Sequence, residues 1–433
     1  MKCTINISPI QTEFTLKNST SYAGSKPFLV FLEKIKLFYV FEQVGCAKKP
    51  NSLFSMSRIL MYLIVGWLLG YERLFYFRSL QNDTLIRRFL GGKCPHYSLL
   101  YKELGRLANT VPTVRDDLRR INQQLISPHL PSELVLDFDS TVNTVFGNQE
   151  GAAVGVNPHK PGRKSYHPVM VYEGKSRFCL NAILRPGNTH SSTDILTFAK
   201  ETLKLVANGH AVKYVRFDKG FGGEEFYRFW EDVKIGYVGK LKWTKRLQAE
   251  VANCRYWKRF INEDIIIEGI TLVYQATSWK NSRFVVVIRK AHRQDEDQLQ
   301  FYDFLWEYEA MVTNLAWEPI DIWRFYNQRA CMENYIKEAK HGFSMEAIST
   351  SSFVANEIDL LLKLLAYNLF ERFKAGFCDP VHRGFTIQRF RRDFLHVTGI
   401  LITHSRKVIL KMAEPFHNRQ SWERIANKVA LLI

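Results

Sequence analysis

Apolar residues recur at helical spacing over the first part of the chain, between about residues 26 and 126. In several segments they stand three or four positions apart and the pattern stops near Gly, which is typical of amphipathic helices. The longest uncharged apolar run, Ile59–Tyr71, holds thirteen residues, whereas a helix needs roughly 20 to span a bilayer. We therefore predict a helical bundle in which Ile59–Tyr71 is a buried core helix, and no membrane association.

From Glu133 the pattern changes to alternation, which predicts β-strands. In the run Glu133–Thr141, Leu134 and Phe138 point to one side, while Asp137 and Asp139 point to the other. Further strands are predicted at 166–173, 177–187, 212–221 and 235–243, and helices at 194–209 and 224–233. The order of elements is therefore three strands, helix, strand, helix, strand.

This order predicts a mixed five-stranded sheet with flanking helices. Three consecutive strands can form an antiparallel meander, and strands that alternate with helices add by parallel crossovers. The arrangement is RNase H-like, with its first and fourth strands as neighbours and its final helix still missing. A second β-rich stretch, residues 242–314, follows. We interpret it as an insertion that precedes the missing helix.

The missing helix is predicted at Tyr326–Lys340, which contains no Gly or Pro. At about 100° per residue, its polar and apolar residues fall on opposite faces. The polar face holds Tyr326, Arg329, Glu333, Lys337 and Lys340, and the other face holds Cys331, Met332, Tyr335 and Ala339. Taken alone, this helix is explained equally well by a solvated face with an ordinary Arg329–Glu333 ion pair.

The formal net charge of +18 indicates what kind of molecule the chain binds. Such an excess favours polyanions, with nucleic acid as the first candidate and an anionic membrane surface as the second. Basic residues also edge the predicted bundle, which suits DNA binding, for example by a helix-turn-helix. A solvated amphipathic bundle explains them about as well. These residues are Arg87, Arg88, Lys93, Arg106, Arg115, Arg119 and Arg120.

The seven cysteines stand alone, without a CxxC or Cys/His cluster. This spacing argues against a zinc site and a disulfide framework, and suits a reducing cytosol. The N-terminal residues lack a basic segment followed by an apolar core, so we expect no secretory signal. The expected localisation is cytoplasmic.

Three acidic residues are candidates for binding a catalytic metal ion. Asp139 ends the first predicted strand, Asp218 ends the fourth, and Glu333 lies on the final helix. Because the first and fourth strands are neighbours, the two Asp side chains are expected side by side, with the helix bringing Glu333 to them. Three carboxylates suit a pair of Mg²⁺ ions, or Mn²⁺, in phosphodiester chemistry. Asp137 points to the same side as Asp139 and is the alternative first ligand.

The final helix has the spacing Tyr-(2)-Arg-(3)-Glu-(6)-Lys, filled by Tyr326, Arg329, Glu333 and Lys340. This resembles the signature of the DDE transposases of bacterial insertion sequences, in the insertion-sequence-four superfamily. The segments VLDFDSTV, QEGA, LRPGN, RFDKGF, MVTNL and MENYIKEAK resemble its thirteen-eighty group in particular. The resemblance covers most of the chain.

The resemblance implies that Asp139, Asp218 and Glu333 are the catalytic, metal-binding triad. Basic and aromatic residues of the helix would contact DNA phosphates at the transposon end, since Arg and Lys suit such contacts. They are Tyr326, Arg329, Lys337 and Lys340. In relatives the β insertion helps to hold a flipped base. Trp306 and Tyr308 lie in that neighbourhood, but we favour a hydrophobic-core interpretation for both.

The expected function is therefore a cut-and-paste transposase that binds terminal inverted repeats, cleaves the ends and joins them to target DNA. It would act as a homodimer in the synaptic complex, in the nucleoid of a bacterium. Two alternatives remain: a stand-alone RNase H-fold nuclease or resolvase, and a catalytically silent DNA-binding protein descended from a transposase.

The predicted fold class is α/β: an RNase H-like catalytic core interrupted by a β-rich insertion, with an all-helical N-terminal domain and a helical C-terminal tail. The predicted regions are a loose N-terminal arm (1–25), a helical DNA-binding domain (26–130), the first part of the core (131–241), the insertion (242–314), the final core helix (315–350) and the helical C-terminal region (351–433).

Overall fold

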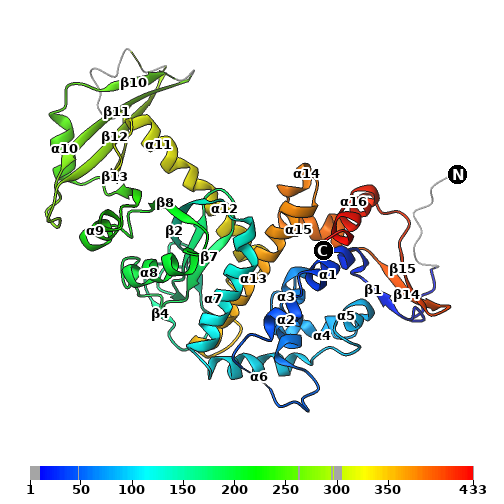
Figure 1. Cartoon of the computed structure of the whole chain (residues 1–433). Helices are drawn as coiled ribbons and strands as arrows, with labels where there is room; N and C mark the ends of the chain where they lie inside the picture. Colours follow the sequence, from blue (N-terminus) through cyan, green and yellow to red (C-terminus); the bar gives the residue numbers. More distant parts are fainter. Residues whose placement is uncertain (1–9, 47, 262–263, 294–295, 297–304, 433) are drawn as a thin grey trace.

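The computed structural model describes residues 10–46, 48–261, 264–293, 296 and 305–432. Figure 1 shows a mixed α/β protein with a large sheet towards one end and most helices gathered at the other. The helix α13 (Phe353–Phe377) runs between the two parts. The predicted α/β class, with a large mixed sheet and many helices, is confirmed.

Five strands at one side of the sheet follow the predicted order. Their spatial order is β7-β6-β2-β8-β9, with β2, β8 and β9 parallel and β6 antiparallel to both of its neighbours. The first and fourth predicted strands, β2 and β8, are therefore neighbours, as expected. The bounds are β2 (Glu133–Ser140), β6 (Val169–Glu173), β7 (Cys179–Ile183), β8 (Ala211–Phe217) and β9 (Gly236–Leu241), with the helices α8 (Ile195–Val206) and α9 (Glu224–Asp232).

The β-rich stretch extends this same sheet. Strand β13 pairs antiparallel with β9, and β12, β11 and β10 follow outward to give nine strands in one sheet. The periodicity predicts these strands but not their union with the core sheet, because alternation along one strand does not specify its neighbour. The bounds are β10 (Lys258–Ile261), β11 (Ile265–Tyr274), β12 (Arg283–His292) and β13 (Glu307–Thr313), with the helix α10 (Lys245–Ala252).

The segment between β2 and β6 contains three short strands. They are β3 (Asn143–Thr144), β4 (Ala153–Val154) and β5 (Lys164–Tyr166). These strands form a separate small sheet in the order β3-β5-β4. The small sheet therefore lies directly after the strand end that carries Asp139.

The N-terminal region of the chain, up to Ile126, is helical, as its periodicity predicts. Its main helices are α1 (Lys26–Lys34), α2 (Leu37–Phe41), α3 (Met56–Leu69), α4 (Phe77–Leu80), α5 (Thr84–Phe89), α6 (Tyr97–Ala108) and α7 (Thr113–Ile126). In α3 every residue except Arg58 is buried. The Ser55 hydroxyl caps its first turn, and Gly70 ends it at φ 97°, a conformation that glycine adopts without strain.

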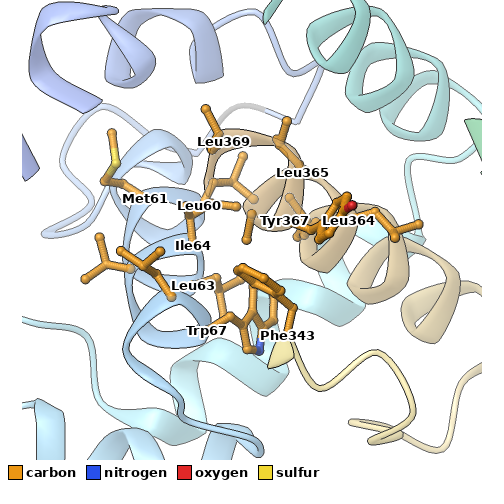
Figure 2. Close-up of a cluster of buried hydrophobic side chains, with 14 of the residues drawn as sticks. Leu60, Met61, Leu63, Ile64, Trp67, Phe343, Leu364, Leu365, Tyr367 and Leu369 are labelled. Atoms are coloured by element: carbon orange, nitrogen blue, oxygen red, sulfur yellow. The ribbon is translucent and has the colours of Figure 1, made fainter. Parts of the chain in front are cut away.

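The apolar run Ile59–Tyr71 forms the core of the bundle, as predicted. Figure 2 shows side chains of α3, such as Leu60 and Trp67, gathered with Leu364 and Leu365 of α13. No single helix in the part of the chain that the structure describes is long and apolar enough to cross a membrane. The segments Met56–Leu69 and Leu74–Leu80 pass that test only as a pair, bent by 93°.

The N-terminal and C-terminal helices share one hydrophobic core. Buried residues of α1 to α7 belong to the same cluster as those of α13 and the final helix α16 (Arg419–Ala430). The boundaries predicted at 130 and 351 therefore do not separate two independent cores. The intervening short helices are α14 (Pro380–Arg383) and α15 (Ile387–Phe390).

The C-terminal tail is not all helical, which corrects that prediction. Strands β14 (Gly399–His404) and β15 (Lys407–Met412) form a hairpin with a two-residue turn at Ser405 and Arg406, both of which have positive φ. Such turns match the twist of antiparallel strands, and the flanking Ile and Val residues favour β structure.

The predicted loose arm contains a short strand and buried residues close to the first helix. Strand β1 (Ser19–Thr20) pairs with β14, and residues Ala23–Ser25 are buried. Gly24 has no room for a side chain, since an added Cβ would lie 1.8 Å from the Phe394 carbonyl oxygen. Residues 1–9 of the arm lie outside the described residues.

Helical side chains close the outer edge of the sheet at β7. The Asn368 side chain accepts a hydrogen bond from the Cys179 N–H at 2.9 Å and donates to the Cys179 carbonyl at 2.8 Å. From α7, the Gln123 amide donates to the Leu180 carbonyl, and Arg119 to that of Ala182. Edge strands present unpaired backbone groups, so these contacts both satisfy β7 and attach the helices to the sheet.

We predict that Asn368→Ala lowers the free energy of unfolding by about 1–3 kcal/mol, because it leaves the buried Cys179 N–H without a partner. Urea denaturation measures this loss. The matched control is Asn208→Ala, which removes an exposed side chain and is expected to change stability by less than about 0.5 kcal/mol. Equal effects of the two substitutions would contradict the edge-capping account.

Candidate active site

Two acidic residues end adjacent parallel strands. In the pairing of β2 with β8, Phe138 is the partner of Phe217, so Asp139 and Asp218 are the next residues on each strand. Neighbouring strands lie about 5 Å apart. The predicted side-by-side placement of Asp139 and Asp218 therefore follows from the observed register.

The Asp139 carboxylate lies in a buried and partly compensated position. Its Oδ1 atom is 3.1 Å from Nη2 of Arg329 and accepts a hydrogen bond from the Ser140 N–H at 2.8 Å. Burial raises the pKa of Asp139, Arg329 and the Ser140 N–H lower it, and the charges of Asp218 and Glu333 raise it again.

Asp137 is committed to a structural ion pair. Its two oxygens accept hydrogen bonds from Nε and Nη2 of Arg216 at 2.6 and 2.7 Å, and both side chains are almost fully buried. The remaining Nη1 of Arg216 donates to the Phe325 carbonyl at 2.6 Å. Because the guanidinium occupies both oxygens, Asp137 is poorly placed to serve as an alternative ligand.

The helical segment that carries Glu333 is not one uniform helix. It consists of α11 (Pro319–Asn327), a 3₁₀ turn (Gln328–Ala330), α12 (Cys331–Lys337) and a π-helical turn (Glu338–Gly342). A single period of 100° therefore places the side chains only approximately: Cys331, expected on the buried face, is exposed. Irregular turns of this kind occur often at functional sites.

Arg329 attaches this segment to the end of β2. Besides its ion pair with Asp139, its Nη2 donates to the Phe138 carbonyl at 2.9 Å. The alternative interpretation, an ordinary surface ion pair between Arg329 and Glu333, is therefore not the contact that Arg329 makes. Its Nε is buried and has no hydrogen-bond partner among the described residues.

The other residues predicted to contact DNA differ in exposure. Tyr326 is buried at 8% exposure within a cluster of apolar side chains, with the Lys240 ammonium 5.4 Å from its ring centre. Lys337 is exposed. Lys340 is half-buried and donates to the Val142 carbonyl at 3.0 Å, and burial lowers the pKa of its ammonium group.

The preferred core interpretation of the two insertion aromatics agrees with the structure. Trp306 is buried at 7% exposure, and the Arg289 guanidinium lies 4.3 Å from its ring centre. Tyr308 stacks on Trp243 with ring centres 5.0 Å apart. Neither residue is free to stack on a base in this arrangement.

The predicted ligands Asp139, Asp218 and Glu333 are carboxylates, which are the hard oxygen donors that a divalent cation such as Mg²⁺ prefers. Among the described residues, however, no three His, Cys, Asp or Glu side chains lie close enough together to hold a metal ion. The arrangement therefore provides the ligand chemistry on adjacent elements, with Arg329 as the nearest positive charge to Asp139, and not a completed metal centre.

Arg216 is the functional neighbour that the sequence analysis missed. The signal for it was present, because Asp137 and Arg216 are 79 residues apart, and so are Asp139 and Asp218 (218 − 139 = 79). Equal separations on two parallel strands place both pairs in one register. The Asp137–Arg216 ion pair joins the two strands, and Asp139 and Asp218 lie at their C-terminal ends.

A family model described as transposase DDE domain group 1 matches residues 4–432 of the chain. No curated protein sequence matches it. Among solved structures, the chain is similar to the piggyBac transposase synaptic complex with hairpin DNA, determined by cryo-EM. That similarity has a TM-score of 0.45 and 13% sequence identity, and covers 86% of this chain and 79% of that one. Since the family model spans nearly the whole sequence, the chain belongs to the transposases with a DDE domain of group 1.

Proposed function

We propose that this chain is a cut-and-paste DNA transposase of a bacterial insertion sequence, in the insertion-sequence-four superfamily and closest to its thirteen-eighty group. Its core would be RNase H-like, with the β7-β6-β2-β8-β9 sheet as the platform. The observation that carries the proposal is the placement of Asp139 and Asp218 on adjacent strand ends, with Arg329 joining the Glu333 segment to the same point.

In this proposal Asp139, Asp218 and Glu333 hold the divalent cations, Mg²⁺ or Mn²⁺. A bound divalent cation activates water or a 3′-hydroxyl and stabilises the leaving oxygen in phosphodiester chemistry. Arg329 and the exposed Lys337 would orient the phosphate backbone beside these carboxylates. Lys340 supports the β2–β3 connection through its bond to the Val142 carbonyl and would add positive charge there.

The proposed partners are the terminal inverted repeats and target DNA, bound by two copies of the chain in the synaptic complex, in the bacterial cytoplasm. The helical N-terminal region remains the candidate for end recognition. Several of its basic residues are engaged within the protein: Arg115 pairs with Glu357, and Arg119 with Glu201. Exposed residues such as Arg88 and Lys93 are better candidates for DNA contacts.

We predict that Glu333→Gln and Asp218→Asn abolish Mg²⁺-dependent cleavage and joining of the element's own ends, because each removes a charge that the cation requires. Glu333 is exposed and Asp218 only partly buried, so folding and DNA binding are expected to persist. Gel assays of end cleavage and strand transfer measure the effect, and chelation of the metal is expected to mimic it.

Two substitutions act as controls. Glu225→Gln removes an exposed carboxylate on α9 and is expected to leave cleavage unchanged. Asp137→Asn is expected to destabilise the protein by about 3–5 kcal/mol, because it leaves the buried Arg216 charge uncompensated. Normal cleavage by Glu333→Gln would remove the transposase proposal, whereas cleavage without joining by the wild-type chain would favour a stand-alone nuclease.

We predict that Lys337→Ala weakens binding to DNA and lowers the slope of log affinity against log salt by about one, because one phosphate contact is lost. Thermal stability is expected to stay constant, since the side chain is exposed. Lys340→Ala is expected to weaken binding and also lower stability, because its ammonium supports Val142. Fluorescence anisotropy over a salt series tests both, and an unchanged slope in Lys337→Ala would exclude that residue from the interface.

A further inference from the structure

The hairpin of β14 and β15 forms an exposed two-stranded ribbon. Figure 1 shows it beside β1, at the end of the molecule opposite the β insertion. Every residue from Thr403 to Ile409 is exposed, so the tip of the hairpin extends beyond the body of the protein. Six residues in each strand give a ribbon about 20 Å long, at roughly 3.3 Å per residue. The acidic triad lies on other elements, and the proposed chemistry leaves this ribbon unused.

The charged side chains of the ribbon are all positive. Arg406, Lys407 and Lys411 are exposed, and the chain has no Asp or Glu between Asp393 and Glu414. The neighbouring Arg392 and Arg419 pair with carboxylates, whereas within the described part of the chain no carboxylate pairs with the three ribbon cations. These three cations therefore remain available to an external anion.

Arg406 occupies a backbone conformation that few side chains adopt. Ser405 and Arg406 have φ angles of 47° and 65° and form the turn between His404 and Lys407. Two-residue turns of this kind favour Asn-Gly or Asp-Gly, because glycine adopts the left-handed region without a steric cost. Glycine at position 406 would relieve the turn, so the guanidinium held there indicates a contact outside the folded chain.

The base of the ribbon is attached to the N-terminal helices. Strand β1 pairs with β14, and the Thr20 hydroxyl of β1 donates a hydrogen bond to the Asp83 carboxylate at 2.9 Å. Asp83 also caps the first turn of α5. This helix carries the exposed Arg88, which is already a candidate for DNA contacts. The ribbon and α5 therefore form one connected unit with basic side chains on both elements.

The two lysines of the ribbon share one face. Lys407 and Lys411 stand four residues apart on β15, and alternate residues of a strand point to the same side. The opposite face carries the cross-strand pair Leu401 and Leu410, which packs on the hydrophobic core. The face with the lysines is therefore the one that an external partner meets.

Duplex DNA fits a ribbon of this shape and charge. The major groove, about 12 Å wide, admits a two-stranded β-ribbon, and its base edges include the guanine acceptors that an Arg guanidinium binds through two hydrogen bonds. Phosphates border the groove on both sides and attract lysines. The tip and the lysine face of this ribbon offer both kinds of group.

A second copy of the chain is a less suitable partner. Strand β15 is the outer strand of its sheet, so its edge could pair with another strand. Such pairing would bring together two strands that each carry Lys407 and Lys411, and like charges opposite one another destabilise a sheet. Lysines on an edge strand discourage pairing for this reason. Arg406 lies in the turn, where protection of the edge does not explain it.

We propose that the β14–β15 ribbon is a second DNA-recognition element, which inserts its tip in the major groove of duplex DNA. Arg406 contacts base edges, and Lys407 and Lys411 contact the bordering phosphates. This inference rests on the proposed function. It assigns part of the recognition of the terminal repeat to a region outside the predicted helical DNA-binding domain (26–130).

The first test measures affinity for two duplexes of equal length, one with the terminal sequence of the element and one with that sequence scrambled. A chelator prevents cleavage. Lys407→Ala combined with Lys411→Ala is expected to lower the slope of log affinity against log salt by about two. Arg406→Ala is expected to weaken binding to the terminal duplex by about tenfold. The control Lys204→Ala removes an exposed ammonium from α8 and is expected to bind as the wild type.

Two further variants separate recognition from folding. Arg406→Gly suits the turn, so it is expected to melt no lower than the wild type and yet to bind the terminal duplex as weakly as Arg406→Ala. Arg406→Lys keeps the charge but not the planar fork, so the salt slope is expected to persist while the preference for the terminal duplex falls.

Methylation interference tests the groove itself, because guanine N7 lies in the major groove. Methylation at particular guanines of the terminal duplex is expected to block binding of the wild-type chain. At least one of these positions is expected to lose its effect in Arg406→Ala.

Wild-type affinity and salt slope in both Arg406→Gly and the double lysine variant would overturn the proposal. So would a smaller dimer fraction of these variants at unchanged affinity for DNA, measured by analytical ultracentrifugation, because that result would assign the edge of β15 to contacts between copies. Both outcomes differ from a failure of the proposed function, in which Glu333→Gln cleaves the element's ends at the normal rate.

Discussion

The parallel pairing of β2 with β8 is the constraint on which the site depends. Its register pairs Asp137 with Arg216 inside the sheet and places Asp139 beside Asp218 at the C-terminal ends of the two strands. A shift of one residue in a strand moves every side chain to the opposite face. The buried ion pair therefore protects the register that brings the two carboxylates together, although neither of its members belongs to the triad.

Arg329 extends this constraint from the sheet to the final helical segment. One guanidinium nitrogen contacts both the Asp139 carboxylate and the Phe138 carbonyl, so the position of Glu333 is tied to the strand end. The contact also offsets part of the negative charge of Asp139.

The sequence predicted the elements of the sheet well because alternation and helical spacing are local properties. Asp139, Asp218 and Glu333 could be singled out as candidate ligands for the same reason, since each stands at a recognisable position in its own element. The edge contacts of Asn368 with Cys179 could not be predicted, because they join residues 189 apart. The union of β13 with β9 and the shared core of the two helical regions depend on tertiary packing in the same way. The π-helical turn at Glu338–Gly342 was not predicted, because a fixed period of 100° per residue describes only a regular α-helix.

The central claim is that Asp139, Asp218 and Glu333 face one cation site, and Fe²⁺-mediated oxidative cleavage of the backbone tests it most directly. Iron bound in place of Mg²⁺ generates radicals that cut the polypeptide only close to the ion, and mass spectrometry locates the cuts. The account predicts cuts near all three residues, suppressed together by excess Mg²⁺. Cuts confined to one of the three segments, or at unrelated positions, would contradict it.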